Sequence, residues 1–290
     1  MSVTRTTSPT LLQQVARLDQ LDAGLLERLR HEALTVPREW VAEYGQYQSG
    51  GWWTLSLLND TGIPTDATIK DCDPVETTLL QRMPATRKFL SSLGLRYMWV
   101  RLARLAPNSF LWEHRDYDEL SESERHRLHV PLVTNSSAAI VTGGAKVHLY
   151  AGHLWRLTPT YLHGACNLLG PDRLHLILDC YENDKLAQVS ASEQLSETDV
   201  VQLPAATRAQ LDEHLATAHS LASLGYEHSA EKHLLRLFYA YALPDGCVYD
   251  LIASLYDSLD RLTEAEYWRA NKTVLLGLSG PSAISEGVRP

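Results

Sequence analysis

Apolar residues recur at two different spacings along the chain, and these spacings divide it into three parts. Over residues 10–34, leucine and valine are mostly three or four positions apart, as on one face of a helix. We therefore predict one or two amphipathic helices here, which cover a face of the sheet that follows. The same spacing over residues 75–93 predicts a further helix.

The central part of the chain consists instead of short apolar runs separated by clusters of Gly, Pro, Asn and Ser. Runs of roughly four to nine residues are typical of strands, and many short strands in succession indicate a β-sandwich or barrel. We predict strands over residues 52–58, 97–105, 129–133, 138–141, 146–150, 153–157 and 174–180. The expected fold is mainly β with helical flanks.

The last third of the chain is helical in pattern, and residues 204–278 contain one strong break, at Pro244-Asp245-Gly246. Small and apolar residues recur 35 positions apart, as in Leu224 and Leu259, which is close to the period of a tetratricopeptide repeat. A tetratricopeptide-like arrangement and a plain helical extension are the two alternatives. We expect a β domain with supporting helices over residues 1–189 and a helical C-terminal domain over residues 190–290.

Composition excludes several classes of protein. The chain of 290 residues has a formal net charge of -9 and no long run of Lys or Arg, which argues against a nucleic-acid partner. No apolar stretch has the length of a membrane span or a signal peptide, so we expect a cytoplasmic protein without a membrane partner. The 4 cysteines form no C-x-x-C pair, so neither a zinc knuckle nor a disulfide framework is indicated.

Aromatic residues, amides and glycine gather in residues 44–53. Rigid aromatic walls and directed amide hydrogen bonds suit a loop that covers a small-molecule substrate. A surface turn followed by a strand explains the same residues equally well. Both interpretations stay open.

The candidate chemistry begins with His114 and Asp116. In an extended segment residues two positions apart project to one side, and His163 can return to the same place across a sandwich. Two histidines and one carboxylate on one face of a metal leave other positions open, which is the arrangement of non-haem Fe(II) oxygenases. Glu113 points the opposite way and is expected to lie in solvent.

An iron site of this kind needs a further source of electrons to activate dioxygen, and 2-oxoglutarate is the usual one. Arg173 lies ten residues after His163, on the next predicted strand. Its forked guanidinium is well placed to bind the distal carboxylate of 2-oxoglutarate.

The motifs around these residues resemble a known family when they are taken in order. They are His114-Arg115-Asp116-Tyr117, residues 127–133, Gly152-His153-Leu154-Trp155, His163 and residues 173–179. This series is similar to the aspartyl/asparaginyl β-hydroxylase family of Fe(II)/2-oxoglutarate-dependent dioxygenases, and especially to its bacterial proline-hydroxylase-like branch. Residues 49–52 and 100–104 resemble that branch as well, and the likeness covers residues 44–181.

The resemblance implies a double-stranded β-helix core, a jelly roll of the cupin kind. It further implies that His114, Asp116 and His163 ligate iron as the catalytic centre and that Arg173 holds 2-oxoglutarate. The carboxylate of Asp116 favours hydroxylation over halogenation, because halogenases of the wider superfamily have a small residue at this position.

Three more residues are candidates for binding the co-substrate. The resemblance implies contacts with 2-oxoglutarate for Arg127 and His129, and His175 is a further candidate. For the two histidines, a hydrogen-bonded place in the core is the alternative.

The substrate is less defined than the metal site. The proline-hydroxylase-like features favour a free amino acid or a close derivative, and a charged loop, residues 118–127, is expected to close over it. The candidate substrate-binding residues are Trp52, Trp53, Asn59, Arg101 and Arg104. For the two arginines, a salt bridge to an acidic residue is the alternative.

The expected reaction is hydroxylation of an unactivated C–H bond with Fe(II), 2-oxoglutarate and O2, with ascorbate as the reductant in vitro. One alternative is the same chemistry on a carrier-bound or peptide substrate, because helical repeats are common docking surfaces. Desaturation or cyclisation on the same scaffold is another. The last is a non-catalytic metal-binding jelly roll that acts as an interaction module.

Overall fold

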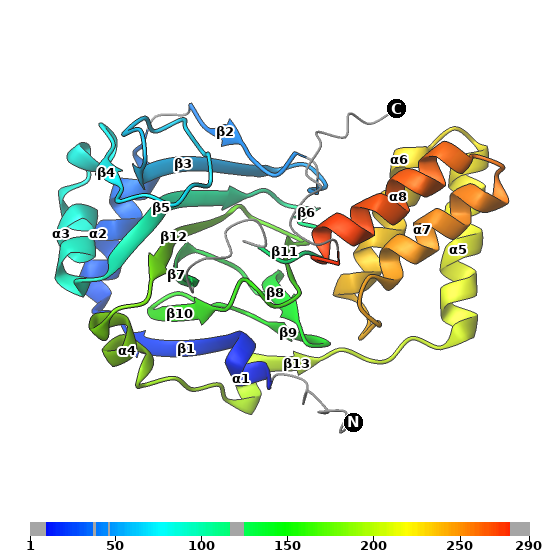
Figure 1. Cartoon of the computed structure of the whole chain (residues 1–290). Coiled ribbons are helices and arrows are strands. Elements are labelled where there is room, and N and C mark those ends of the chain that lie inside the picture. The colour runs from blue at the N-terminus through cyan, green and yellow to red at the C-terminus, as the bar shows by residue number, and fades with distance from the viewer. Residues whose placement is uncertain (1–9, 37–38, 46, 117–124, 279–290) are drawn as a thin grey trace, which may run out of the picture.

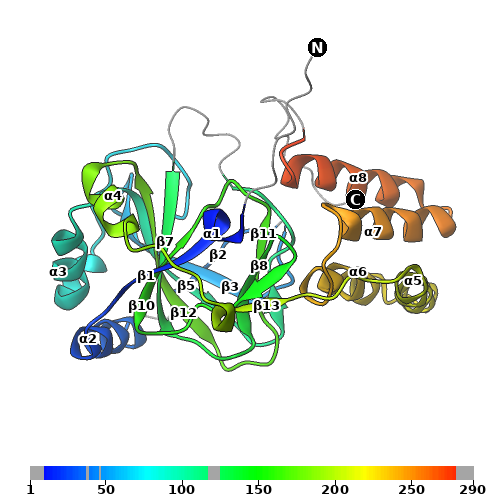
Figure 2. The same cartoon turned by 90° about the horizontal axis from the view of Figure 1, so that it is seen from below.

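A computed structural model of the chain describes residues 10–36, 39–45, 47–116 and 125–278. Within these residues, two antiparallel sheets face each other at the centre, and helices lie on opposite sides of them (Figure 1 and Figure 2). The core is a jelly roll, so the predicted fold class is confirmed. No helix in the described ranges combines the length and the apolar character that a membrane span requires.

The larger sheet has the strand order β1-β10-β7-β12-β5-β3-β2, with β4 paired to β3. Its strands are β1 (Val15–Gln20), β2 (Val41–Ala42), β3 (Trp52–Asn59), β4 (Val75–Glu76), β5 (Arg96–Leu105), β7 (Arg125–Val133), β10 (His153–Leu157) and β12 (Arg173–Tyr181). The smaller sheet has the order β13-β9-β8-β11-β6. Its strands are β6 (Ser109–Phe110), β8 (Ala138–Thr142), β9 (Ala145–Val147), β11 (His163–Asn167) and β13 (Val200–Gln202).

The space between the sheets is filled by an apolar cluster to which both sheets contribute. Because side chains alternate along a strand, a strand of the smaller sheet can serve two cores. In β8, Ile140 belongs to the cluster between the sheets, while its neighbours Ala139 and Val141 pack with the C-terminal helices.

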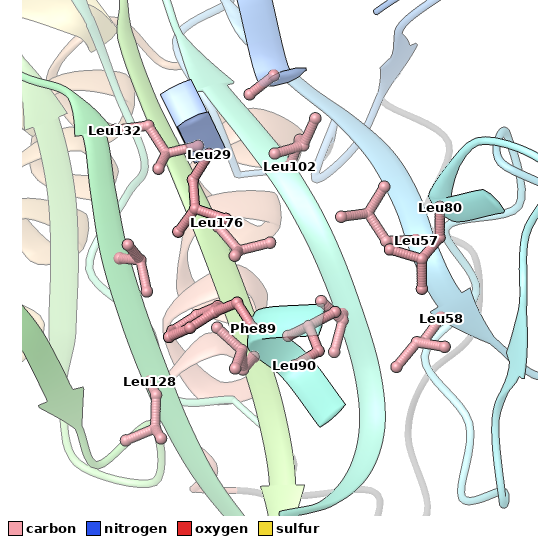
Figure 3. Packing of buried hydrophobic residues seen from close by; sticks show 14 of the residues in the cluster. Leu29, Leu57, Leu58, Leu80, Phe89, Leu90, Leu102, Leu128, Leu132 and Leu176 are labelled. Carbon is pink, nitrogen blue, oxygen red and sulfur yellow. The ribbon is translucent and has the colours of Figure 1, made fainter. Parts of the chain in front are cut away.

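The outer face of the larger sheet is covered by α2 (Ala23–Leu34) and α3 (Pro84–Leu93). Leu29 of α2 and Phe89 of α3 pack in one leucine-rich cluster with strand residues such as Leu176 (Figure 3). This cluster fills the outer side of the sheet beneath the helices, so the polar residues that its strands carry on the other face point between the two sheets.

The outer face of the smaller sheet is covered by the C-terminal helices (Figure 2). These are α5 (Arg208–Ser223), α6 (Glu227–Leu235), the 3-10 turn η3 (Arg236–Tyr239), α7 (Cys247–Ser258) and α8 (Leu262–Leu275). The short elements α4 (Asp184–Ser190) and η2 (Glu197–Asp199) lie in the connection between the last strand of the larger sheet and β13. The helices share one apolar cluster with strand residues such as Phe110 and Cys166.

Two of the predicted helices are wrong in part. Residues 10–34 form α1 (Leu11–Gln14) and α2, but residues 15–20 between them are β1, because they pair with β10 at the edge of the larger sheet. In residues 75–93 the α-helix begins only at Pro84, after β4 and the turn η1 (Leu80–Arg82). Proline is favoured at the first position of a helix, where no backbone N–H is needed.

The tetratricopeptide-like arrangement of the C-terminal helices stays a prediction, and so does the division into domains at residue 190. The structure adds one fact that bears on the division. Strand β13 lies beyond residue 190 and still pairs with β9, so the smaller sheet draws on both of the expected parts.

Candidate metal centre

The two candidate histidines are joined by their backbones. His163 begins β11, and His114 forms an isolated antiparallel bridge with it, with two N–H to O bonds of 3.0 Å each. The paired backbones bring the two rings to a centroid distance of 4.4 Å. The return of the chain across the sandwich, expected from the sequence, is therefore achieved by strand pairing.

Asp116 completes a cluster of three buried side chains. Its Oδ1 lies 3.5 Å from Nε2 of His114, and its Oδ2 lies 3.6 Å from Nε2 of His163. The ligand atoms of the three residues all lie within 4.8 Å of one another. Among the described residues this is the one group of three or more His, Cys, Asp or Glu side chains arranged in this way.

Hydrogen bonds at Nδ1 fix which nitrogen of each ring faces the cluster. Nδ1 of His114 lies 2.7 Å from the carbonyl oxygen of Trp112, and Nδ1 of His163 lies 2.9 Å from that of Tyr161. A backbone carbonyl can only accept, so each Nδ1 carries the proton and each Nε2 keeps a free lone pair. Burial lowers the pKa of His163 to about 3, which keeps its ring neutral.

Behind the metal ligands runs a chain of buried charges. Arg127 donates to Asp116 and, through Nε, to Oδ1 of Asp179 at 2.7 Å, and Asp179 also pairs with Arg101. Burial alone would raise the pKa of Asp116, but Arg127 and the neighbouring histidines outweigh it and hold this pKa well below its usual range. Asp116 is therefore ionised, as a metal ligand must be.

This chain of charges allows a first test of stability. Because Asp179 faces two buried guanidinium groups, Asp179→Asn should lower the free energy of unfolding by about 3–5 kcal/mol, the usual result of removing one partner of a buried pair. Asp172→Asn, which weakens the half-exposed pair with Arg104, should cost less than about 1 kcal/mol. Urea unfolding of both variants measures the difference, and equal losses would contradict it.

Arg173 is a buried cation that has no counter-ion among the described residues. Its side chain lies on β12 beside the metal ligands, and the residue is 2% exposed. In the described part of the chain it has no carboxylate partner, and its Nη1 has no hydrogen-bond partner. Burial lowers the pKa of Arg173 to about 10, so it stays charged at neutral pH and needs an anion beside it.

His175 and His129 continue the line from Arg173. Nε of Arg173 donates to Nε2 of His175 at 3.1 Å, and Nδ1 of His175 lies 3.4 Å from Nδ1 of His129. Nη2 of Arg173 also lies 2.8 Å from Nδ1 of His175, and among the described residues Nε2 of His129 has no hydrogen-bond partner. His129 lines the cavity, whereas His175 stands behind it.

One narrow cavity connects these groups. It is lined by Tyr44, Trp52, Leu111, His114, Arg127, His129, Ile140, Leu157, His163, Ala165, Arg173 and Ile177. The structure therefore brings together two of the candidate metal ligands, three of the candidate co-substrate residues and Trp52. Asp116 reaches the same place through its contacts with His114 and Arg127.

The aromatic stretch 44–53 supplies two site residues that were not singled out from the sequence. Tyr44 lines the cavity and accepts a hydrogen bond from Nη2 of Arg101 at 3.2 Å. The ring of Tyr47 lies 4.9 Å from that of His114 and 5.0 Å from that of Tyr44. The unusual composition of the stretch was the available signal, but it did not say which aromatic residues face inward.

Three of the candidate substrate residues lie elsewhere. Trp53 and Arg104 are paired across β3 and β5 on the outer face of the larger sheet, where they line a separate cavity of about 630 Å³ with Asp172. Side chains alternate along a strand, and the neighbouring residues Trp52 and Ala103 point into the space between the sheets. Trp53 and Arg104 therefore point away from the metal ligands. Asn59 is also not at the site, since its side chain bonds to the backbone of residues 62, 63 and 66 and holds a turn.

Arg101 needs a different correction. It is fully buried on the inner face of β5, but its guanidinium is already engaged by Asp179 and Tyr44. The salt bridge that was the alternative for this residue is therefore present. Arg101 supports the charges behind the metal ligands, and both of its Nη atoms already have partners.

The predicted lid over the substrate, residues 118–127, lies mostly outside the described residues, and only its end, which belongs to β7, is placed. Glu113 was expected in solvent, and this is wrong. It is 3% exposed, and both carboxylate oxygens accept from the backbone N–H of Gly246 at the start of α7. Burial raises the pKa of Glu113 to about 7.

The fold and the site define a class of protein, a jelly roll with a metal site of two histidines and one carboxylate. The sequence profile of aspartyl/asparaginyl beta-hydroxylase matches residues 23–183, which is more than half of the chain. The chain therefore belongs to the aspartyl/asparaginyl β-hydroxylase family, as its motifs indicated. The three candidate metal ligands and Arg173 all lie within the matched residues.

Two characterised relatives are proline hydroxylases. The chain is 28% identical over 147 residues to L-proline cis-4-hydroxylase of Rhizobium meliloti (strain 1021), a match that covers 49% of this chain and 51% of that protein. It is 26% identical over 167 residues to L-proline cis-3-hydroxylase 1 of a Streptomyces species, covering 55% and 57%. The chain thus spans about half the length of these relatives.

Solved structures with a similar course of the chain include an oxidoreductase of the 2OG-Fe(II) oxygenase family from Burkholderia pseudomallei. Its TM-score is 0.39 at 15% identity, and the match covers 55% of this chain and 79% of that one. A prolyl-4-hydroxylase of Pseudomonas putida has a TM-score of 0.39 at 16% identity, with 59% and 92% covered.

Proposed function

We propose that the protein is an Fe(II)- and 2-oxoglutarate-dependent dioxygenase that hydroxylates an amino acid or a close derivative. One observation carries this proposal. Candidate ligands for a divalent metal line the same cavity as Arg173, a buried arginine for which the described residues provide no counter-ion. A divalent metal would fill the site of the three ligands, and a dianionic ligand bound to the open positions of the metal would also supply the anion that Arg173 needs.

The donor set fits Fe(II). Two neutral imidazole nitrogens and one ionised carboxylate on one side of a metal are the facial arrangement of non-haem iron oxygenases. His114, Asp116 and His163 would hold the metal, which together with 2-oxoglutarate and O2 supplies the oxidant for a C–H bond while 2-oxoglutarate is converted to succinate. The charge chain through Arg127 and Asp179 would keep Asp116 ionised and oriented.

Arg173 would bind the distal carboxylate of 2-oxoglutarate. Charge-assisted contacts from a forked guanidinium are among the strongest polar interactions in proteins, and Nη1 of Arg173 is free to make one. His129 lines the same cavity and would contact the same ligand. The cavity measures about 20 Å³, close to the space of one water, so we expect its side chains to move apart when the co-substrate enters.

The substrate would lie beside the aromatic residues that cover the metal ligands. Tyr44, Tyr47 and Trp52 form a tilted stack, with ring centroids 5.0 Å and 5.6 Å apart for the two pairs that involve Tyr44. Such walls suit the apolar body of a small amino acid and exclude water from the reacting carbon. The two proline hydroxylases among the relatives support a free amino acid of this kind.

The direct test supplies the full-length protein with Fe(II), ascorbate, 2-oxoglutarate and a panel of free amino acids that includes L-proline. We expect formation of succinate coupled one-to-one to an amino acid that gains the mass of one oxygen. Formation of succinate without a change in any amino acid would contradict a free amino acid as the substrate. A carrier-bound or peptide substrate would then be preferred.

The same assay separates the other outcomes. Loss of two hydrogens in place of gain of oxygen would indicate desaturation or cyclisation. Binding of metal without binding of 2-oxoglutarate and without turnover would favour the non-catalytic metal-binding interaction module. A cytoplasmic location, and the lack of nucleic-acid and membrane partners, remain predictions from composition.

A further inference from the structure

The segment that carries the first two metal ligands has two chemically different sides. Side chains of an extended segment alternate, so His114 and Asp116 point one way while Glu113 and Arg115 point the other. The first pair faces the metal site, and the second pair faces the C-terminal helices. One short stretch of backbone thus joins the metal ligands to residues far away in the sequence.

Glu113 is held by the start of α7. Gly246, the residue that caps this helix, donates its N–H to both carboxylate oxygens of Glu113, at 3.0 Å and 3.2 Å. The hydroxyl of Tyr249 in the first turn of the helix donates to the backbone oxygen of Glu113. A carboxylate is favoured at this end of a helix, because the free N–H groups there carry partial positive charge.

Arg115 is held by the end of α8. Its backbone N–H donates to the carbonyl oxygen of Leu275 at 2.8 Å, and its Nε donates to that of Leu276 at 3.1 Å. A cation is favoured at this end of a helix, where free carbonyl groups carry partial negative charge. The start of α7 and the end of α8 both meet this segment, where Glu113 accepts from the N–H of Gly246 and Arg115 donates to the carbonyl oxygen of Leu276.

Arg115 also reaches the turn that orients the second histidine. Its Nη1 donates to the carbonyl oxygen of Thr160 at 2.7 Å, and the next residue, Tyr161, accepts from Nδ1 of His163. The N–H of Asp116 donates to the carbonyl oxygen of Pro159, in the same turn, at 2.9 Å. Arg115 therefore links α8, the segment of the first two ligands and the turn before the third.

The helices contact the far side of the ligand strands as well. The hydroxyl of Tyr239 donates to the carbonyl oxygens of Leu111 and, at 3.1 Å, of Ala165. Gly164, which follows His163, leaves room for this contact, since a Cβ there would lie 2.4 Å from the Tyr239 hydroxyl oxygen. Trp112 packs its ring 4.8 Å from that of Trp268 in α8.

We propose that the C-terminal helices position the metal ligands, with Arg115 as the main positioning residue and Glu113 as the second. The inference rests on the metal centre proposed above and adds a function for residues 239–276, which form no part of the family match. The helices then set how well the three ligand atoms are arranged before a metal arrives. They act through hydrogen bonds and not by touching metal or co-substrate.

The test measures Mn(II) affinity in the full-length protein by electron paramagnetic resonance of the free ion. Arg115→Met keeps the apolar stem but removes the bonds to Leu276 and Thr160. We expect its Kd for Mn(II) to rise about 10- to 100-fold, the usual effect of losing a group that orients a metal ligand, and the spectrum of bound Mn(II) to broaden. Arg115→Lys should lie between, because an ammonium group cannot reproduce the forked contacts.

Arg269→Met is the matched control. Arg269 pairs with Asp257 between α8 and α7, at the surface and away from the ligand segment, so this variant removes a charge contact of the same helices. Its Kd should stay within about twofold of the original, as expected for an exposed pair. The thermal unfolding midpoint of each metal-free variant shows whether stability differs.

Three results would overturn the inference. The first is that Arg115→Met binds Mn(II) as tightly as the original protein. The second is that Arg115→Met and Arg269→Met both lose Mn(II) affinity, each to the extent that its unfolding midpoint falls. If Arg115→Met does not fold, the Mn(II) affinity of Glu113→Gln is measured in its place. An unchanged Mn(II) affinity in Glu113→Gln is the third result. Failure of the unaltered protein to bind Mn(II) would instead refute the proposed metal centre, and with it this inference.

Discussion

Replacing His163 with alanine is expected to abolish turnover and to weaken metal binding most strongly among the changes considered. His163 supplies one of three ligand atoms, and its Nδ1 is already committed to the carbonyl of Tyr161. Two remaining ligands cannot hold the metal firmly on one face. The loss of affinity should exceed the roughly 10- to 100-fold that follows from disturbing a group bonded to a ligand. Titration with Mn(II) and succinate release measure the two effects.

His219→Ala is the control for loss of a histidine. His219 lies on α5, where its ring contacts only Ser223 among the hydrogen bonds described, and it is exposed. Metal affinity and turnover should be unchanged in this variant. Retention of full turnover in His163→Ala would show that the ligand assignment is wrong, since no other described cluster of three such side chains could replace it.

Replacing Arg173 with methionine is expected to have the second largest effect, and in two opposite directions. KM for 2-oxoglutarate should rise at least roughly 30-fold, because removing one partner of a desolvated charge pair costs about 2 kcal/mol or more. The unliganded protein should become more stable, since Arg173 is a buried cation with no counter-ion in the part of the chain that the structure describes. Steady-state kinetics and thermal unfolding without ligand test both parts.

The predicted effect of Arg173→Met on KM can be tested more specifically with a second co-substrate. A 2-oxo acid without a distal carboxylate, such as 2-oxobutyrate, cannot use Arg173, so the original protein should discriminate against it and the variant should not. Arg104→Met is the control, because Arg104 lies on the opposite face of the same sheet with a partner, Asp172. A normal KM in Arg173→Met, or an equal rise in both variants, would exclude Arg173 as the co-substrate anchor.

The sequence predicted the β core well because the core depends on short-range patterns, and the structure brings the three candidate metal ligands together. Apolar runs between turn residues located the central strands, and most strand ends fall within one to three residues of the prediction. The two-residue spacing of His114 and Asp116 also holds in the structure. His163 needed long-range information, which came from the ordered motifs around it.

The substrate residues were predicted less well, because side-chain direction on a strand changes with every residue. Trp52 faces the cavity and Trp53 does not, although both fit an aromatic wall. The same rule could have found Asp179, since Arg173, His175 and Asp179 lie two and four positions apart along β12 and so share one face of it. Its partner Arg101 lies on another strand, and a single sequence does not give that pairing.

The predictions for Glu113 and for residues 15–20, which form β1, were wrong for a related reason. Each was interpreted from its own neighbours, whereas its environment is made by residues more than a hundred positions away, Gly246 for Glu113 and Leu157 for Val15. A charged residue beside a strand is usually solvated, and a leucine at helical spacing is usually helical. Contacts with distant parts of the chain override both tendencies here.

The contacts of Arg115 place part of the metal site's support outside the region shared with the family. The ligands lie within residues 23–183, whereas the carbonyls of Leu275 and Leu276 come from the end of α8. Substitutions in that helix can therefore reach the ligand segment without altering any residue of the family motifs. In evolutionary terms, the strength of metal binding would then be open to change through residues outside the family match, with the catalytic residues kept as they are.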